Sequence, residues 1–286
     1  MTFKPQKAKT YGKDNIKTHN RNYLVSTKYD GFQVFLTKTQ GEVACYTSNW
    51  KPFSHSIFEK ILSLIDEDNF ILIGEFLHDS DGKLGSRSKS AILTTYRTNK
   101  AKGISNSPDD ELLDKVIVFD CIFSNNFNLK ASERLSKLKT LLKDADILQA
   151  IEVCSMTLPE ALNHAKKLTT DGWEGVMCID PDSTYHAGKR VHHAIKIKPR
   201  LTADLLCVNV LEGEGKYKNM IGSLVLMDKE GRLVNVGSGL TDNDRQLPDS
   251  HYINKVIEIE YERIDGTYTQ PIFKIIRGDK TIHEID

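Results

Sequence analysis

Apolar and polar side chains alternate along much of this chain, a period typical of strands that bury one face. The alternation predicts strands at roughly 22–27, 32–37, 42–47, 70–77, 115–123, 147–153, 174–179 and 193–198. After Pro199 it predicts five more, at roughly 204–212, 221–228, 232–236, 255–263 and 272–276. The chain is therefore expected to be rich in β-sheet from end to end.

Apolar residues at helical spacing predict three helices between the earlier strands. One lies near 57–65, one near 135–142 after the cap-like Ser132, and one near 158–168, where Thr157 and Glu160 have capping-box spacing. Beyond Pro199 only one short helical stretch, near 241–247, interrupts the strands. The pattern predicts an α+β protein with a larger mixed domain, residues 1–200, and a small β-barrel, residues 201–286.

The composition indicates a folded protein. Of 286 residues, 39% are hydrophobic and 27% are charged, enough apolar material for one large domain or two modest ones. No apolar run is long enough to span a membrane, and the first residues lack the apolar core of a signal peptide. A soluble, cytoplasmic protein is expected, and a nuclear location is the alternative. Five scattered cysteines without a Cys-x-x-Cys pair are expected to be reduced and buried.

Charge is balanced overall, with 39 basic and 39 acidic residues, but it is unevenly distributed. The basic segments 1–21, 83–102 and 183–203 contain one acid between them, Asp14. If the fold brings them to one face, they form a phosphate-binding stripe; if not, they are separate solvated loops, and charge alone does not decide. The N-terminal arm and the 83–102 segment are expected to contact phosphates of any polyanionic partner, and the arm, which precedes the motifs described below, is expected to lie outside the pocket that those motifs form.

A Lys-x-Asp-Gly sequence, Lys28 to Gly31, lies between two predicted strands. A lysine at such a turn, followed by a carboxylate and a glycine that lets backbone approach a ligand, suits a nucleophilic amine. Alone the pattern is weak, because a surface turn would look the same. It gains weight from the motifs that follow in order: Gly74-Glu75, Phe119-Asp120, Glu174-Gly175, the pair Lys196 and Lys198 on one face of a predicted strand, and Arg277 to Lys280.

In these motifs and their spacing, the chain resembles the ATP-dependent DNA ligases, within the covalent nucleotidyltransferases. The resemblance covers roughly residues 20–283 and is closest to the minimal ligases of phages and large DNA viruses. It implies a nucleotidyltransferase (adenylation) domain followed by an OB-fold β-barrel. It further implies a monomer that uses ATP and Mg²⁺ to seal nicks in duplex DNA during replication, repair and recombination.

The resemblance also assigns roles. Lys28 would attack the α-phosphate of ATP to form lysyl-AMP, in the neutral form that nearby cations favour, and Asp30 would help at the nick. Phe119 would stack on adenine, while Glu75 and Glu174 would hold the ribose and a metal ion. The remaining nucleotide contacts would come from Gln33, Lys196, Lys198 and the mobile Arg277 of the second domain.

Some positions depart from the family pattern. Gln33 and Ser48 stand where arginines are common, so two phosphate contacts are weaker or come from elsewhere, for example from Lys51 or Arg87. Each site residue also has an ordinary structural interpretation, such as core for Phe119 or a solvated strand end for Glu75. Two other functions stay open: an RNA ligase or mRNA capping guanylyltransferase with the same chemistry, and a nucleic-acid-binding protein without activity.

Overall fold

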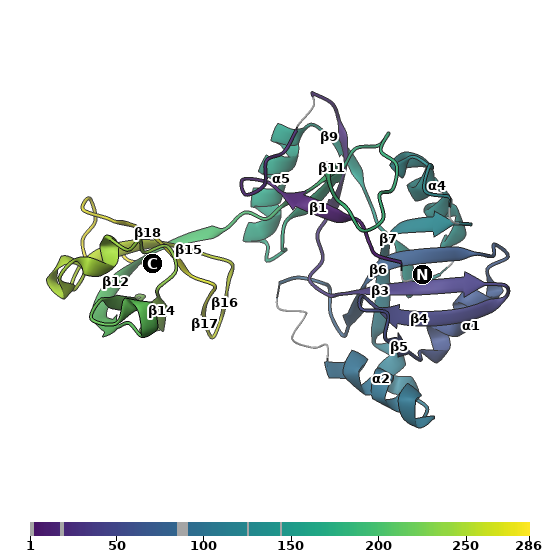
Figure 1. Cartoon of the computed structure of the whole chain (residues 1–286), viewed down its shortest axis with the longest axis horizontal. Coiled ribbons are helices and arrows are strands. Elements are labelled where there is room, and N and C mark those ends of the chain that lie inside the picture. Colours follow the sequence, from purple (N-terminus) through teal and green to yellow (C-terminus); the bar gives the residue numbers. More distant parts are fainter. Residues whose placement is uncertain (1–2, 18–19, 85–90, 125, 144) are drawn as a thin grey trace. The chain divides into compact units, whose positions relative to one another are not determined.

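The computed structural model describes residues 3–17, 20–84, 91–124, 126–143 and 145–286, apart from the side chain of Asp265. The chain divides into two compact units, Met1–Lys198 and Pro199–Asp286 (Figure 1). Each unit has its own hydrophobic core. Among the described residues, no helix is long and apolar enough to cross a membrane.

Six strands form the larger sheet of the first unit. In order across the sheet they are Pro52–Phe53 (β5), Glu42–Thr47 (β4), Phe32–Thr39 (β3), Phe70–His78 (β6), Asp114–Phe123 (β7) and Leu148–Ala150 (β8). Neighbours are antiparallel except β7 and β8, which are parallel. One face carries the main core, to which the helices Ser56–Leu64 (α1), Ala91–Lys102 (α2) and Ala131–Leu141 (α4) contribute buried side chains. Because helices cover this face of the sheet, a ligand site is expected on the opposite face.

Five strands form the smaller sheet of the first unit. In order they are Lys7–Thr10 (β1), Arg190–Ile197 (β11), Val176–Ile179 (β10), Tyr23–Thr27 (β2) and Cys154–Met156 (β9). The helix Leu158–Thr170 (α5) packs on one face, where Val25, Val176 and Ala165 are buried. Because successive side chains of a strand point to opposite faces, the intervening residues face away from α5.

The second unit is an antiparallel sheet of five strands. In order they are Leu233–Val236 (β14), Ile221–Met227 (β13), Leu201–Glu212 (β12), Val256–Tyr261 (β15) and Ile272–Ile276 (β18). Arg263–Asp265 (β16) and Thr267–Thr269 (β17) form a separate two-stranded hairpin. The unit also has 3₁₀ helices at Gly215–Tyr217 (η2), Asp244–Gln246 (η3) and Asp249–His251 (η4). The helix η3 lies within the short helical stretch expected near 241–247, whereas η2 and η4 were not expected.

Most strands agree with the alternation of the sequence, but the strand predicted at 147–153 is wrong. Leu148–Ala150 pairs with β7 in the larger sheet, and Cys154–Met156 pairs with β2 in the smaller one. The chain changes sheet between them, which a pattern of alternating polarity cannot reveal. The helix expected after Ser132 begins two residues earlier, at Ala131, because Glu133 accepts the backbone N–H of Lys130 at 2.7 Å and makes Lys130 the cap. The capping box at Thr157 is confirmed.

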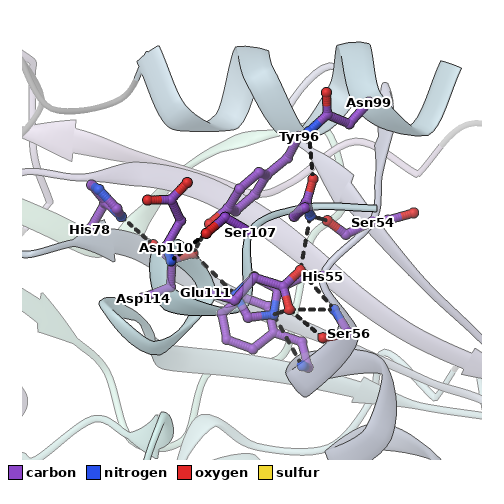
Figure 2. A network of polar contacts seen from close by, with 12 residues as sticks. Ser54, His55, Ser56, His78, Tyr96, Asn99, Ser107, Asp110, Glu111 and Asp114 are labelled. Atoms are coloured by element: carbon purple, nitrogen blue, oxygen red, sulfur yellow. Dashed lines mark hydrogen bonds and ion pairs between the residues drawn. The ribbon is translucent and has the colours of Figure 1, made fainter. Parts of the chain in front are cut away.

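A buried polar network ties α2 and the short helix Pro108–Leu112 (α3) to the larger sheet (Figure 2). Asp114, at the start of β7, accepts from the Tyr96 hydroxyl of α2 at 2.7 Å, and its other contacts are the rings of His55 at 3.1 Å and His78 at 2.7 Å. Glu111 of α3 accepts from the backbone N–H of Ser56 at 3.0 Å. Neither helix was predicted, since each buries only one or two side chains.

The cysteine prediction needs one correction. Cys45, Cys121, Cys178 and Cys207 are buried and unpaired, as expected, but Cys154 is exposed. It lies in β9, the outermost strand of the smaller sheet, whose short alternation does not turn it inward.

Candidate functional site

A cavity of about 250 Å³ is lined by residues from both sheets of the first unit. The smaller sheet supplies Leu24 and Ser26 of β2, Met177 and Ile179 of β10, and Lys196 of β11. These are the residues that alternate with the core beneath α5, so the strand period itself points them into the cavity. Gln33 of β3, Glu75 of β6 and Phe119 of β7 line it from the larger sheet, and Lys28 lies between the two sets.

Lys28 follows β2 at the edge of this cavity. Its ammonium group forms an ion pair with the carboxylate of Glu174, and the ammonium group of Lys198 pairs with the other oxygen of that carboxylate. The side chains of Lys28 and Glu174 are 23% and 11% exposed. Burial raises the pKa of Glu174, but the two lysines outweigh it and hold that pKa below its usual value. One ionised carboxylate thus serves two ammonium groups.

Lys196 adds a third positive charge to the same region. Burial, followed by the charges of Lys198 and Lys28, lowers the pKa of the Lys196 ammonium group. The prediction that Lys196 and Lys198 share a strand face needs adjustment, because β11 ends at Ile197 and Lys198 lies just beyond it. In this cluster the ammonium groups of Lys28, Lys196 and Lys198 outnumber the carboxylate of Glu174, a balance that suits an anionic ligand, while Glu75 and Asp120 add carboxylates elsewhere in the cavity lining.

Two glycines let backbone segments approach closely around Lys28. Gly175 has φ of +133°, and a Cβ there would lie 2.1 Å from the carbonyl oxygen of Ile197. The carbonyl of Gly175 accepts the backbone N–H of Lys28 at 2.9 Å. A Cβ at Gly31 would lie 2.4 Å from the carbonyl oxygen of Phe76. The glycines of both motifs are therefore needed to bring β2, β10 and β6 together at the lysine.

The other predicted residues of the first unit have distinct environments. Glu75 accepts the backbone N–H of Gly31 at 3.0 Å and lies opposite Gln33 in the β3–β6 register, so these two residues form one wall of the cavity. Phe119 is partly buried, with its ring between two small apolar clusters. The backbone N–H of Asp30 donates to the carbonyl of Gly82 at 2.9 Å. Asp30, Glu174 and Lys198 stand beside the cavity rather than in its lining.

A buried ion pair that the sequence reasoning missed lies on the same cavity. Arg134 of α4 is 2% exposed, and its Nε and Nη2 donate to the two carboxylate oxygens of Asp120 at 2.7 and 3.1 Å. Arg134 also donates to the carbonyl of Leu129 at 2.7 Å. Its spacing from the buried Ala131 and Leu138 was the available signal, because an arginine on the buried face of a helix needs an acidic partner.

The N-terminal arm does not lie outside the cavity, so that expectation is wrong. Lys7–Thr10 pairs in parallel with β11, and Gln6 and Ala8 line the same cavity as Lys28. The side chain of Gln6 accepts a hydrogen bond from the backbone N–H of His186 at 2.8 Å, which fixes the arm to the loop that precedes β11. A basic strand of the type Lys-Ala-Lys-Thr has no apolar alternation to predict it, and it forms because β11 offers it a free edge.

Arg277, the predicted site residue of the second unit, is held by three carboxylates. Its guanidinium donates to Asp279 at 2.8 and 2.7 Å, to Glu258 at 3.0 Å and to Asp204 at 3.2 Å. Lys280 donates to the same Asp204 at 2.6 Å. Hydrogen bonds from the Arg277 guanidinium and from the backbone N–H of Asp279 itself lower the pKa of Asp279 to about 2. All members of this cluster belong to the second unit.

In the part of the chain that the structure describes, no group of three His, Cys, Asp or Glu side chains is arranged so that it could hold a metal ion. Glu75 and Glu174 therefore fit a metal only as single carboxylates alongside oxygens of a ligand. Mg²⁺ commonly binds in this way, through one or two carboxylates and substrate phosphates.

Comparisons with known proteins agree with this geometry. A family model described as the ATP dependent DNA ligase domain matches residues 5–198, and one described as the DNA ligase OB-like domain matches residues 212–277. The predicted fold, a nucleotidyltransferase domain followed by an OB-like domain, is confirmed.

The curated relatives are longer proteins. DNA ligase 2 of Haloquadratum walsbyi is 28% identical, across 92% of this chain and 47% of its own. The DNA ligase of Methanococcus aeolicus is 30% identical, across 91% of this chain and 52% of its own. The chain thus spans about half the length of the curated relatives it matches.

One solved structure is similar along its whole length. It comes from work headed "DNA binding with a minimal scaffold: Structure-function analysis of Lig E DNA ligases". Its TM-score is 0.66 at 19% identity, and the match covers 97% of this chain and 100% of that one. At this identity the similarity concerns the fold.

Proposed function

Because this chain belongs to the family of ATP-dependent DNA ligases, we propose that it seals nicks in duplex DNA through a lysyl-AMP intermediate. The observation that carries the proposal is the position of Lys28, at the edge of the cavity lined by Phe119 and Lys196 and beside the Lys198–Glu174 pair. In the proposal, residues 1–200 form the adenylation domain and residues 201–286 form the OB domain.

In the first step, the Lys28 ammonium group separates from Glu174 and gives one proton to water. The neutral amine then attacks the α-phosphorus of ATP. A P–N bond forms and the nitrogen gives a second proton to water, while the P–O bond to the β-phosphate breaks and pyrophosphate leaves with the electron pair. Lys196 and Lys198 stabilise the negative charge on the phosphoryl oxygens, since preorganised cations act most strongly where charge develops.

The cavity lining suits the adenosine moiety. Phe119 offers an aromatic face for the base, and Leu24, Met177 and Ile179 extend the apolar wall. Glu75 and Gln33 lie together on the other wall as acceptors and donors for the ribose. When bound, Mg²⁺ would neutralise phosphate charge between Glu75 or Glu174 and the triphosphate.

Two transfers complete the reaction. The 5′-phosphate of the nick attacks the AMP phosphorus, the P–N bond breaks, and Lys28 takes two protons from water to return to the ammonium form. The 3′-hydroxyl, beside Asp30, then gives its proton to water and attacks the 5′-phosphorus, and AMP leaves with the electron pair of the broken P–O bond as the phosphodiester forms. Arg277 serves only the first step, by orienting pyrophosphate. A single chain carries all these groups, so the proposed enzyme acts as a monomer.

The test is a sealing assay on a nicked DNA duplex, with ATP and Mg²⁺, against GTP and against a duplex with an RNA nick. Sealing of nicked DNA with ATP supports the proposal. Covalent labelling by GTP without joining would favour a capping guanylyltransferase, and joining confined to RNA would favour an RNA ligase. A protein that binds nicked DNA but is not labelled by either nucleotide would be the inactive binding protein.

A further inference from the structure

A second hollow, which we call the α2 groove, lies next to the nucleotide cavity. It has a volume of about 240 Å³ and is lined by the start of β3, the turn after β4 and one side of α2. Gln33 lines both hollows, so they share this side chain as a wall. Figure 1 shows α2 beside β5 at the edge of the larger sheet.

The charged residues that line the α2 groove are all basic. It contains Lys51 and Arg97 together with the neutral polar residues Gln33, Ser48 and Asn49, and no described lining residue is acidic. In the part of the chain that the structure describes, neither Lys51 nor Arg97 forms an ion pair with an acid. Gln33 and Ser48 are the positions where the sequence lacks two expected arginines, so Lys51 and Arg97 return two positive charges to the same groove. Arg87, the other replacement considered, lies outside the described residues.

Both cations stand on well-fixed parts of the fold. Lys51 ends a turn in which the backbone N–H of Trp50 donates to the carbonyl of Thr47 at 2.8 Å. The ring of Trp50 stacks on that of Phe35, with 4.8 Å between the ring centroids. Arg97 follows Tyr96, whose ring is buried and whose hydroxyl reaches Asp114 (Figure 2). The backbone that carries each cation is therefore fixed, which lowers the entropy cost of placing both charges on one ligand.

We propose that the α2 groove binds a backbone phosphate of the DNA strand whose 5′-end reaches Lys28, with Lys51 and Arg97 as the contacting cations. This inference rests on the proposed ligase function. A strand is favoured over the triphosphate of ATP because Lys28, Lys196 and Lys198 already provide three cations for ATP at the other hollow. Basic residues also continue from the groove along α2 to Lys100, which donates to Ser54 at 3.2 Å. A row of cations suits successive phosphates.

The test compares Lys51→Ala/Arg97→Ala with the wild type and with Lys60→Ala, which removes a positive charge from exposed α1 on the same unit. The readouts are the Kd for nicked duplex as a function of salt and the rate of self-adenylation with labelled ATP. We expect the double variant to bind nicked DNA at least about tenfold more weakly, with a salt slope lower by about 1.8 units at ~0.9 per lost contact. Its adenylation should stay within about twofold of wild type. Lys51→Arg/Arg97→Lys should restore the slope.

An unchanged salt slope in the double variant would overturn the proposal. Loss of adenylation with an unchanged slope would assign the groove to the phosphates of ATP instead. If the wild type itself fails to become adenylated, the proposed function fails, whereas the salt slope of DNA binding still decides the role of the groove. A thermal unfolding midpoint within a few degrees of wild type shows that the variant is folded.

Discussion

The ammonium group of Lys28 forms an ion pair with the carboxylate of Glu174, which also holds Lys198. Glu174 therefore positions the proposed nucleophile between substrate turnovers. We predict that Glu174→Gln slows self-adenylation by about 10²-fold, the cost typical of a reacting group displaced by about 1 Å. Single-turnover labelling measures the rate. Asp171→Asn, an exposed change three residues earlier, is the control and should have no effect; a wild-type rate in Glu174→Gln would show that the pair does not position Lys28.

In the proposed mechanism, Arg277 leaves its carboxylate partners on the second unit and orients pyrophosphate. We predict that Arg277→Ala lowers the rate of self-adenylation at least about tenfold more than the rate of sealing a pre-adenylated nick, because only the first step releases pyrophosphate. The matched control is Lys274→Ala, which removes another cation from the same region, one paired with Glu260 at 2.9 Å. Equal losses in the two assays would contradict a role confined to the first step.

The buried pair of Arg134 and Asp120 should dominate the stability of the first unit. We predict that Asp120→Asn lowers the free energy of unfolding by about 3–5 kcal/mol, because it leaves the Arg134 charge buried without a carboxylate. Glu152→Gln is the control: it breaks an exposed pair with Lys139, at 2.8 Å, and should cost about 0–1 kcal/mol. Urea unfolding followed by tryptophan fluorescence reports on this unit alone, since Trp50 and Trp173 are the two tryptophans of the chain. Similar losses in both variants would refute the ranking.

Glu111 should make stability depend on acidic pH. Burial raises its pKa, but hydrogen bonds from Ser56 and from Asn106, the latter at 2.9 Å, outweigh burial and lower it. A carboxylate with a lowered pKa stabilises the fold above its unfolded pKa of about 4.3, and this contribution is lost as the pH falls through the folded pKa. We predict that Glu111→Gln flattens the fall in unfolding free energy below about pH 4.3 by up to about 1.4 kcal/mol per pH unit. Asn106→Ala should reproduce part of this change. Parallel wild-type and Glu111→Gln curves would rule out the contribution.

Much of the nucleotide cavity was predictable because it depends on strand alternation. In β2, Val25 faces the core while Ser26 faces the cavity, and the same period places Lys196 of β11. The family resemblance added Lys28 and its neighbours, and the structure brings Lys28, Glu174 and Lys198 into contact.

The rest of the site depends on tertiary pairing, which leaves no local periodic signal. Gln6 lines the cavity only because β11 has an edge to which β1 can add. Arg134 and Asp120 are 14 residues apart and meet only when α4 packs on β7. Arg97 lines the α2 groove, and its neighbour Tyr96 on the helix α2 reaches the buried Asp114 at the start of β7.

The most direct test of the central claim is to identify the residue that becomes adenylated. The protein is incubated with Mg²⁺ and ATP labelled at the α-phosphate, denatured, digested, and its labelled peptide sequenced by mass spectrometry. We predict that AMP is attached to Lys28, that ATP labelled at the γ-phosphate leaves no label, and that Lys28→Ala is unlabelled and cannot seal a nick. Label on another lysine, such as Lys196, or label that persists in Lys28→Ala, would contradict the account.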